Sequence, residues 1–403
     1  MAGVFNPNMA ATDAPPVMEA RRWIADKSFP ADRPLINVSQ AAPVAPPPAG
    51  LRQALAETIL TNDAAHLYGP VLGLPDLRAQ VATQWRAAYG GQISPAQVAI
   101  TGGCNMAFAA AMATLTAQGD EVLLPTPWYF NHKMWADMNG VSAVALPCGD
   151  DMLPDLDAAR ARITARTRAI VLVTPNNPTG AEYPAGLIAA FYDLARTNGI
   201  ALVLDETYRD FHSASGAPHG LFTRPDWDDT LIQLYSFSKA YRLTGHRVGA
   251  LVAARARLAQ VEKYLDTVAI CAGQSGQHAA LWGMRNLGPW LAGERDEILS
   301  RRAAIAQGMA RLKPLGWDLL GAGAYFAYVR HPFAIDAADL APALVDMAGV
   351  LLLPGTMFRP KGDPAGRQEL RIAFANIDQA GITTLIERLE NLPGQLAPRA
   401  GHR

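Results

Sequence analysis

The chain has 403 residues, of which 50% are hydrophobic and 18% are charged, and 35 basic against 36 acidic side chains leave a net charge of −1. This composition supplies a sizeable hydrophobic core and excludes an intrinsically disordered chain. The balanced charge argues against proteins that bind nucleic acids or anionic membranes through a basic surface.

The cysteines, histidines and apolar runs indicate a soluble protein of a reducing compartment. Three cysteines lie far apart without CxxC spacing, so neither a disulfide framework nor a zinc site is expected. The eight histidines show no HExxH spacing, and we expect no metal site. The N-terminal segment lacks a secretory signal pattern, and the longest apolar run, MAFAAAMATLTA, is shorter than the roughly 20 residues of a membrane-spanning helix. We expect a cytoplasmic location and no membrane partner.

Residues 46–288 alternate between strand-like and helix-like segments. Six short apolar runs end in Gly, Pro or a polar turn, which is typical of buried strands, and they lie at 98–103, 121–127, 169–178, 201–208, 231–238 and 248–254. A helical pattern with a Gly stop, AGLIAAFYDLARTNG, separates two of them. Strands buried on both faces and separated by helices predict an α/β fold, whose large domain holds a mostly parallel sheet flanked by helices.

The two chain ends predict a smaller α+β domain. From about residue 290 a long amphipathic helix is followed by the strand-like pieces AYFAYVR and GVLLLPG and by a final helix. The helical pattern VMEARRWIADK near the N-terminus is expected to pack with this part. We therefore expect an N-terminal arm and part of the small domain over residues 1–45, the large domain over residues 46–288, and the C-terminal small domain over residues 289–403.

Chemistry is expected at the carboxyl ends of the strands, where open α/β sheets bind their ligands. Gly102 and Gly103 end one strand and a helix follows at once, which forms either a backbone cradle for phosphate or carboxylate, or a simple tight turn. Asp205 ends another apolar strand, either as a helix cap or as the partner of a buried cation such as a protonated pyridine nitrogen. The asparagines of VTPNNPTG either donate to a ligand or begin a turn.

Lys239 is either a solvated surface residue or a nucleophile. It follows an apolar strand together with Ser236 and Ser238, and a lysine at a strand end near other cations can have its pKa lowered and form a Schiff base. Arg247 is a permanent cation that either completes a dianion site with Ser236 or pairs with a carboxylate. A phosphate cradle, an amine, a carboxylate for a cationic ring nitrogen and a donor for a ring oxygen together match pyridoxal 5′-phosphate.

Seven motifs, in order, resemble those of the class I and II aminotransferases, which are fold-type I pyridoxal-phosphate enzymes of the aspartate aminotransferase superfamily. They are LYGPVLGLPDLR, TGGCNMAF, TPNNPTG, DETY, SFSKAYRLTGHRVG, LLLPGTMF and LRIAFAN, and the resemblance covers roughly residues 30–390. The resemblance implies a seven-stranded type of sheet, pyridoxal 5′-phosphate as cofactor and a homodimer with shared active sites. It also implies transfer of an amino group from an L-amino acid to a 2-oxo acid, through a Lys239 Schiff base and pyridoxamine phosphate.

The same resemblance gives individual residues catalytic and substrate-binding roles. Lys239 would form the Schiff base and shuttle the proton, and Asp205 would keep the ring nitrogen protonated. Tyr208 and Asn177 would bind the phenolic oxygen of the cofactor. Arg371 would pair with the substrate α-carboxylate, a task for which its planar, fork-shaped guanidinium is better suited than a lysine.

The other implied contacts surround the cofactor. The phosphate would be bound by Gly103, Cys104, Asn105, Ser236 and Arg247. Tyr129 would stack on the ring, and Tyr68 would reach the phosphate of the neighbouring subunit. Cys104 and Asn105 replace the hydroxyl or basic residues often found in the cradle. Ala41, which would contact substrate through its backbone N–H, stands where the family often has glycine.

Other functions share these motifs. A pyridoxal-phosphate-dependent C–S β-lyase, or a related elimination or decarboxylation enzyme, uses the same cofactor site, because the pocket selects which bond breaks. A non-enzymatic cofactor-binding regulator is disfavoured by the joint presence of Lys239, Asp205 and Arg371. Several aromatic residues suit an apolar substrate, although core packing explains them equally well. No motif locates a second arginine for a distal carboxylate, so the sequence leaves the amino acid substrate open.

Overall fold

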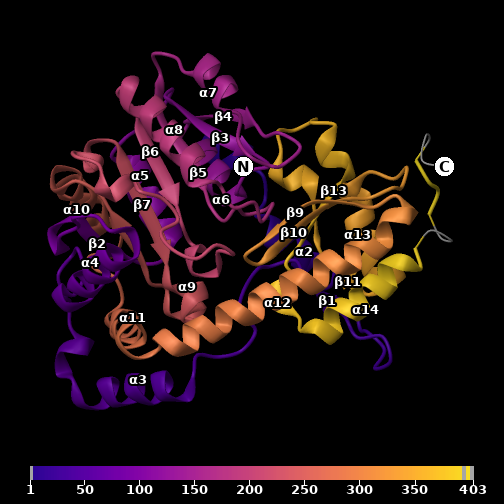
Figure 1. Cartoon of the computed structure of the whole chain (residues 1–403), viewed down its shortest axis with the longest axis horizontal. Helices are drawn as coiled ribbons and strands as arrows, with labels where there is room; N and C mark the ends of the chain where they lie inside the picture. Colours follow the sequence, from indigo (N-terminus) through magenta and orange to yellow (C-terminus); the bar gives the residue numbers. More distant parts are fainter. Residues whose placement is uncertain (1–2, 393–395, 400–403) are drawn as a thin grey trace.

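The computed structural model describes residues 3–392 and 396–399 (Figure 1). The extreme ends of the expected N-terminal arm and C-terminal domain, including His402, therefore lie outside the described residues. Across the described ranges, no helix is long and apolar enough to cross a membrane. The same residues contain no group of three or more His, Cys, Asp or Glu side chains arranged to hold a metal ion.

A seven-stranded sheet forms the centre of the larger part, with the strand order β2-β8-β7-β6-β5-β3-β4. Its strands are β2 (Val98–Thr101), β3 (Glu121–Thr126), β4 (Ser142–Pro147), β5 (Thr167–Val173), β6 (Ala201–Asp205), β7 (Leu231–Ser236) and β8 (Gly249–Val252). Strand β8 is antiparallel to both of its neighbours, and the remaining neighbours pair in parallel. The expected α/β fold with a mostly parallel sheet is confirmed.

Helices cover both faces of this sheet (Figure 1). One hydrophobic cluster packs α4 (Pro75–Tyr89), α8 (Ala185–Thr197) and α11 (Gln274–Asn286) against one face, and another packs α5 (Cys104–Ala113), α6 (Phe130–Met138) and α10 (Arg255–Ala269) against the other. In β6, Leu202 and Leu204 face the first cluster, whereas Ala201 and Val203 face the second. Because side chains alternate along a strand, Asp205 falls on the face that α5 and α6 cover.

The bounds of α4 follow from its sequence. Pro75 stands at the start of the helix, where its fixed φ suits the helix and its missing N–H costs no hydrogen bond. Gly90 ends the helix in the left-handed conformation with φ 73° and donates its N–H to the Arg86 carbonyl oxygen. Leu77, Val81 and Trp85 recur at helical spacing and are all buried, so this face of the helix packs on the sheet.

A second, antiparallel sheet lies in the other part of the molecule, with the order β12-β13-β10-β9. Its strands are β9 (Asp318–Gly323), β10 (Phe326–Arg330), β12 (Leu353–Pro354) and β13 (Glu369–Ile372). A two-residue strand near the N-terminus, β1 (Ile36–Asn37), pairs in parallel with β11 (Val350–Leu351). The N-terminal segment is thus joined to the C-terminal part by backbone hydrogen bonds.

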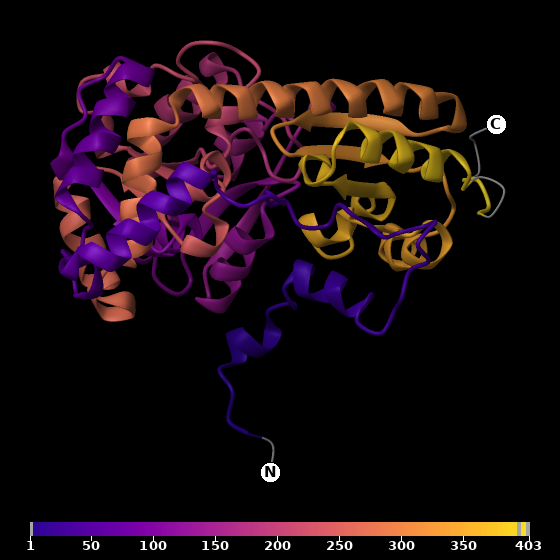
Figure 2. The same cartoon turned by 90° about the horizontal axis from the view of Figure 1, so that it is seen from below.

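The remaining α-helices lie before, between and after these strands in the chain. They are α1 (Pro7–Ala11), α2 (Pro16–Arg22), α3 (Ala49–Thr61), α7 (Leu156–Arg162), α9 (Phe237–Ala240), α12 (Gly288–Leu312), α13 (Ala337–Ala348) and α14 (Gln379–Glu390). The long α12, drawn in orange, runs from the helices beside the large sheet to the small sheet (Figure 2). We propose domain boundaries at residues 45/46 and 288/289, because Ile36 and Val38 share one hydrophobic cluster with α12, α13 and α14.

Candidate active site

A cavity of about 600 Å³ lies at the carboxyl ends of β5, β6 and β7. Its lining comes from the N-terminal segment, the large sheet and β13. The cavity collects eleven of the thirteen expected site residues: Ala41, Cys104, Asn105, Tyr129, Asn177, Asp205, Tyr208, Ser236, Lys239, Arg247 and Arg371. Two lie outside the lining: Gly103 immediately precedes α5 behind it, and Tyr68 is 80% exposed.

One end of the cavity is suited to hold an anion, and we refer to it as the anion cradle. Ser236, at the end of β7, and Cys104, at the N-terminus of α5, both line it, and the free N–H groups of that helix carry a partial positive charge. Gly103 has φ 94°, and a Cβ atom added there would lie 2.3 Å from Nη2 of Arg247. The glycine therefore permits both the backbone turn and the close approach of the arginine.

Asp205 is held as a carboxylate inside the protein. It is 3% exposed, and its Oδ1 accepts hydrogen bonds from the Thr207 backbone N–H at 3.0 Å and the Cys104 thiol at 3.6 Å. Nε2 of His132 lies 3.4 Å from Oδ2, and the imidazole stacks on Phe108. Burial opposes ionisation, but the charge and hydrogen bond of His132 and the Thr207 hydrogen bonds outweigh it and lower the pKa of Asp205.

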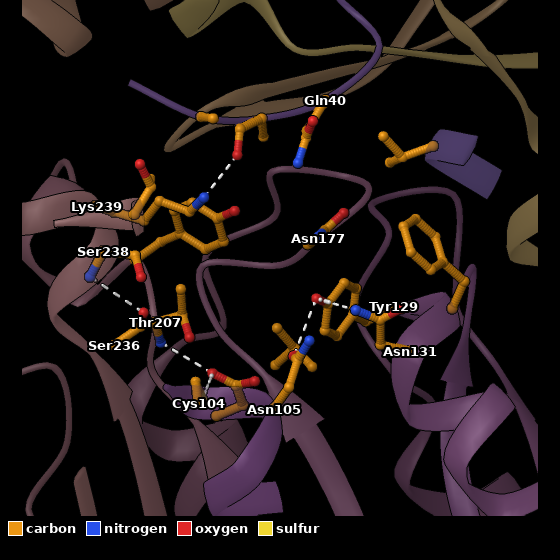
Figure 3. Close-up of a pocket in the computed structure, with 18 of the residues that line it drawn as sticks. Gln40, Cys104, Asn105, Tyr129, Asn131, Asn177, Thr207, Ser236, Ser238 and Lys239 are labelled. Carbon is orange, nitrogen blue, oxygen red and sulfur yellow. Dashed lines mark hydrogen bonds between the residues drawn. The ribbon is translucent and has the colours of Figure 1, made fainter. Parts of the chain in front are cut away.

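Lys239 projects into the cavity from the short helix α9 (Figure 3). Its Nζ donates a hydrogen bond to the carbonyl oxygen of Ala41 at 2.6 Å. Burial lowers the pKa of Lys239 to about 8, and the positive charges of Arg247 and Arg371 add to this effect. A lysine with such a pKa is partly neutral near neutral pH, which is the state in which an amine acts as a nucleophile.

Aromatic and amide side chains form the wall between the cradle and Arg371. The Tyr129 hydroxyl donates to Oδ1 of Asn105 at 3.2 Å and accepts from the Asn131 amide at 2.8 Å (Figure 3). Burial raises the pKa of Tyr208 well above its usual value, so its hydroxyl keeps its proton at neutral pH. The ring of Tyr208 lies 5.9 Å from Nζ of Lys239.

Arg371 stands on the face of β13 opposite to the hydrophobic neighbours Leu370 and Ile372. Its Nη1 donates to Oδ1 of Asn177 at 2.9 Å, and its Nη2 donates to the Ser39 carbonyl oxygen. Within the described chain its buried Nε has no hydrogen-bond partner. Burial lowers the pKa of Arg371 to about 10, so the guanidinium is a positive charge with an unused donor beside the cavity.

Comparison with known proteins decides the family. The model of aminotransferase class I and II matches residues 33–389. The chain is 25% identical to an aromatic aminotransferase of Arabidopsis thaliana, over 96% of this chain and 95% of that protein. It is 28% identical to a probable aspartate/prephenate aminotransferase of Thermus aquaticus, over 78% and 83% of the two chains. Aspartate aminotransferase from Thermus thermophilus shares the fold, with a TM-score of 0.86 and 22% identity over 96% and 99% of the chains.

The chain belongs to the class I and II aminotransferases. It is therefore a pyridoxal-phosphate-dependent transaminase of fold type I, as the sequence motifs predicted. The substrates named for these relatives differ, so family membership leaves the amino acid used by this aminotransferase undetermined.

The lining of the aminotransferase cavity fits the cofactor. The helix N-terminus and Arg247 suit a phosphate dianion, and the ionised Asp205 suits a protonated ring nitrogen. Lys239 and Arg371 line the same cavity. The amine of Lys239 suits the aldehyde of the cofactor, and the guanidinium of Arg371 suits the carboxylate of an amino acid substrate. A single ligand carrying all of these groups satisfies the buried charges together.

Sequence reasoning missed several residues that the aminotransferase fold brings to this site. Thr207 and Ser238 line the cavity within the DETY and SFSK motifs, which marked their positions without assigning either residue a role. His132 follows the aromatic pair that contains Tyr129, but only packing of α6 shows that it contacts Asp205. Arg21, from α2, lines the cavity without any motif to reveal it.

Asn376 is a further missed residue, and it orders the loop that carries Ala41. Its Nδ2 donates to the carbonyl oxygens of Gln40 at 2.5 Å and Asn37 at 3.3 Å, and its Oδ1 accepts from the Ala42 N–H at 3.2 Å. The motif LRIAFAN therefore supplies both Arg371 and Asn376, whose side-chain amide holds the loop that contains Gln40 and Ala41.

Proposed function

We propose that this aminotransferase moves the amino group of an L-amino acid to a 2-oxo acid, with Lys239 as the amine that binds the cofactor covalently. The observation that carries the proposal is the position of Lys239: its amine, with a pKa near 8, shares one cavity with the Asp205 carboxylate and the Arg371 guanidinium. These are the groups that a cofactor aldehyde, a ring nitrogen and a substrate carboxylate require.

The cofactor would be held by residues at three places. Its phosphate would be bound by Gly103, Cys104, Asn105, Ser236 and Arg247. Its ring nitrogen would face Asp205, its phenolic oxygen would face Tyr208 and Asn177, and Tyr129 would stack on its ring. When bound, pyridoxal phosphate supplies an electron sink that stabilises negative charge at the substrate α-carbon. The buried and ionised Asp205 supports this role, because its pKa is lowered by His132 and Thr207 in spite of burial.

Lys239 would also move the proton of the reaction. An amine on a four-carbon chain reaches more than one atom from a single anchor point, which suits one acid–base group that serves two neighbouring carbons. Its pKa near 8 supports this assignment, since acid–base groups work best with a pKa close to the working pH. Arg371 would orient the substrate through its α-carboxylate, displacing or sharing its present contact with Asn177, and the Ala41 backbone would face the same group.

A homodimer with shared active sites is part of this proposal. Tyr68, the residue expected to reach the neighbouring subunit, is 80% exposed and lies away from the cavity of its own chain. It belongs to a set of exposed large hydrophobic residues within one short stretch of the chain: Ile59, Leu60, Leu67 and Tyr68. Exposed apolar surface of this kind favours association. A cytoplasmic location also remains part of the proposal.

Two measurements test the proposed reaction. Borohydride reduction of the holoenzyme followed by peptide mass analysis should find the cofactor on Lys239, and finding it on another lysine would refute the assignment. Incubation with an amino donor alone should stop after one half-reaction, and a 2-oxo acid should restore the starting spectrum. Continued release of ammonia and pyruvate from the donor alone would instead indicate a C–S β-lyase or a related elimination enzyme.

A further inference from the structure

The helix α2 forms part of the cavity wall on the side of the N-terminal segment. Val17, Met18 and Arg21 of this helix line the cavity together with Gln40. Figure 3 shows Gln40 near the Lys239 end of the cavity, away from Cys104 and Asn105 of the anion cradle. A substrate that engages Lys239 and Arg371 would therefore extend its side chain into the region that α2 borders.

Arg21 brings a positive charge to this region without a negative partner. Its Nη2 donates to the neutral Oε1 of Gln40 at 3.1 Å, and its Nη1 lies 4.0 Å from the Met18 sulfur. In the part of the chain that the structure describes, no carboxylate lies within ion-pair distance of Arg21. The neighbouring Arg22, by contrast, pairs with Glu19 at 2.5 Å and does not line the cavity.

The other cations of the cavity already have assigned anions. Arg247 would meet the cofactor phosphate and Arg371 the substrate α-carboxylate, while Asp205 is the only acidic side chain among the described residues of the lining. Asp205 lies beside Cys104 and His132, where it would pair with the ring nitrogen of the cofactor. Arg21 is the one guanidinium of the described lining for which the cofactor and the α-amino acid groups provide no partner.

One loop of the N-terminal segment contacts Arg21 as well as the two cations that would face the substrate, Lys239 and Arg371. Three consecutive residues of one loop accept hydrogen bonds from three different cations: Ser39 from Arg371, Gln40 from Arg21 and Ala41 from Lys239. Because the Gln40 contact is made through a neutral amide, a carboxylate would be a stronger acceptor for the same guanidinium. Arg21 is thus available to a group on the substrate side chain.

We propose that Arg21 binds the distal carboxylate of an amino dicarboxylic acid, which makes glutamate- or aspartate-like compounds the preferred substrates. This inference rests on the proposed function and adds the substrate class. The competing substrate class is apolar or aromatic, because Val17, Met18 and Phe130 also line the cavity. A fork-shaped cation without a carboxylate partner favours the dicarboxylic acid, since it forms two charge-assisted hydrogen bonds with a carboxylate.

The test compares Arg21→Gln and Arg21→Lys with the matched control Arg22→Gln. Arg, Lys and Gln have similar helix propensities and Arg21 is exposed, so the variants should fold. In Arg21→Gln, the ratio of kcat/KM for glutamate to that for norvaline should fall about tenfold or more, as expected for loss of a charge-assisted contact. Arg21→Lys should retain part of the preference, and Arg22→Gln should leave the ratio unchanged.

Equilibrium binding provides a readout that does not depend on turnover. The wild-type holoenzyme should bind glutarate more tightly than valerate, which has the same length and one carboxylate fewer, and Arg21→Gln should remove this difference. Amino transfer from neutral donors combined with equal binding of glutarate and valerate would overturn the inference and leave the proposed function intact. Absence of transfer with any donor would overturn the proposed function, and the two binding constants would still decide the role of Arg21.

Discussion

Lys239 donates its hydrogen bond to the carbonyl oxygen of Ala41, a residue 198 positions earlier in the chain. The contact joins α9, at the end of the large sheet, to the loop that follows β1 of the small unit. Both sides of the cavity are thereby connected through the amine that we propose as the nucleophile. The neighbouring Ser39 accepts in the same way from Arg371, so this loop contacts both groups that we propose to face the substrate.

Replacing Lys239 by alanine should abolish covalent attachment of the cofactor. Phosphate contacts at the cradle do not involve this side chain, so the variant should still bind pyridoxal phosphate non-covalently. Turnover should fall at least 10²-fold, and about 10⁴-fold if Lys239 carries the whole proton transfer, because general acid–base catalysis contributes in this range. Absorbance spectra, borohydride trapping and steady-state assays measure the three effects. Wild-type turnover by Lys239→Ala would exclude the assigned role.

Attachment of the cofactor to the apoprotein should depend on pH through Lys239. Burial and the nearby arginines lower its pKa from the usual 10.5 of lysine to about 8, so the amine is mainly protonated below pH 8 and mainly neutral above it. Only the neutral amine attacks an aldehyde. The attachment rate should therefore rise about tenfold per pH unit well below pH 8 and level off above it. Stopped-flow absorbance across this range checks the prediction, and a rate still rising at pH 10 would contradict it.

Substitution of Gly103 by alanine should weaken cofactor binding far more than the same change at Gly102. Gly103 has φ 94° and a new Cβ atom would lie 2.3 Å from Arg247, whereas at Gly102 the nearest atom is the flexible end of Met106 at 3.0 Å. Moving Arg247 away from the cradle would remove a charge-assisted contact to the phosphate, which corresponds to at least about a tenfold loss of affinity. Equilibrium dialysis or fluorescence titration of each apoprotein with pyridoxal phosphate measures this affinity. Equal affinities of the two variants would argue against the cradle.

Exchange of His132 for phenylalanine should weaken the cofactor site through Asp205. The new ring retains a surface that can stack on Phe108 but removes the imidazole nitrogen that lies 3.4 Å from the carboxylate. The pKa of Asp205 would then rise, because burial is no longer offset by His132. We expect about a tenfold loss of cofactor affinity and a changed pH profile of the bound cofactor spectrum. Trp135→Phe, which alters the edge contact with Phe108 and leaves His132 in place, serves as the control.

Replacing Arg371 by alanine should mainly weaken amino acid binding. The change removes the guanidinium that would pair with the α-carboxylate, and it leaves the Ser39 carbonyl and Asn177 without their donor. An affinity loss of about 10- to 10²-fold is expected from charge-assisted hydrogen bonds. Titration of the holoenzyme with a slow substrate gives this value directly. Arg330→Ala, on the neighbouring strand β10 of the same sheet, should have no such effect. Unchanged affinity in Arg371→Ala would mean that the carboxylate site lies elsewhere.

The amino-acid sequence by itself indicated six of the seven strands of the large sheet, the cofactor and the candidate site residues, whereas β4 was not predicted. Apolar runs ending in glycine or polar residues marked the strands, and the period of two along β6 determined which face Asp205 occupies. The position of Lys239 after β7 followed from the same pattern. These features are local, since they depend on the order of neighbouring residues and on motifs that are continuous in the chain.

Only the tertiary structure showed which of the candidate residues contact one another at the cavity. Asn176 donates to the Val173 carbonyl oxygen and the Tyr183 hydroxyl and so stays within its own turn, whereas Asn177 contacts Arg371, although the two amides are adjacent in the sequence. The approach of His132 to Asp205 and of Arg21 to Gln40 depends on how helices pack, which no local period encodes. Such contacts join segments far apart in the chain, so the folded structure alone decides which side chains share the cavity.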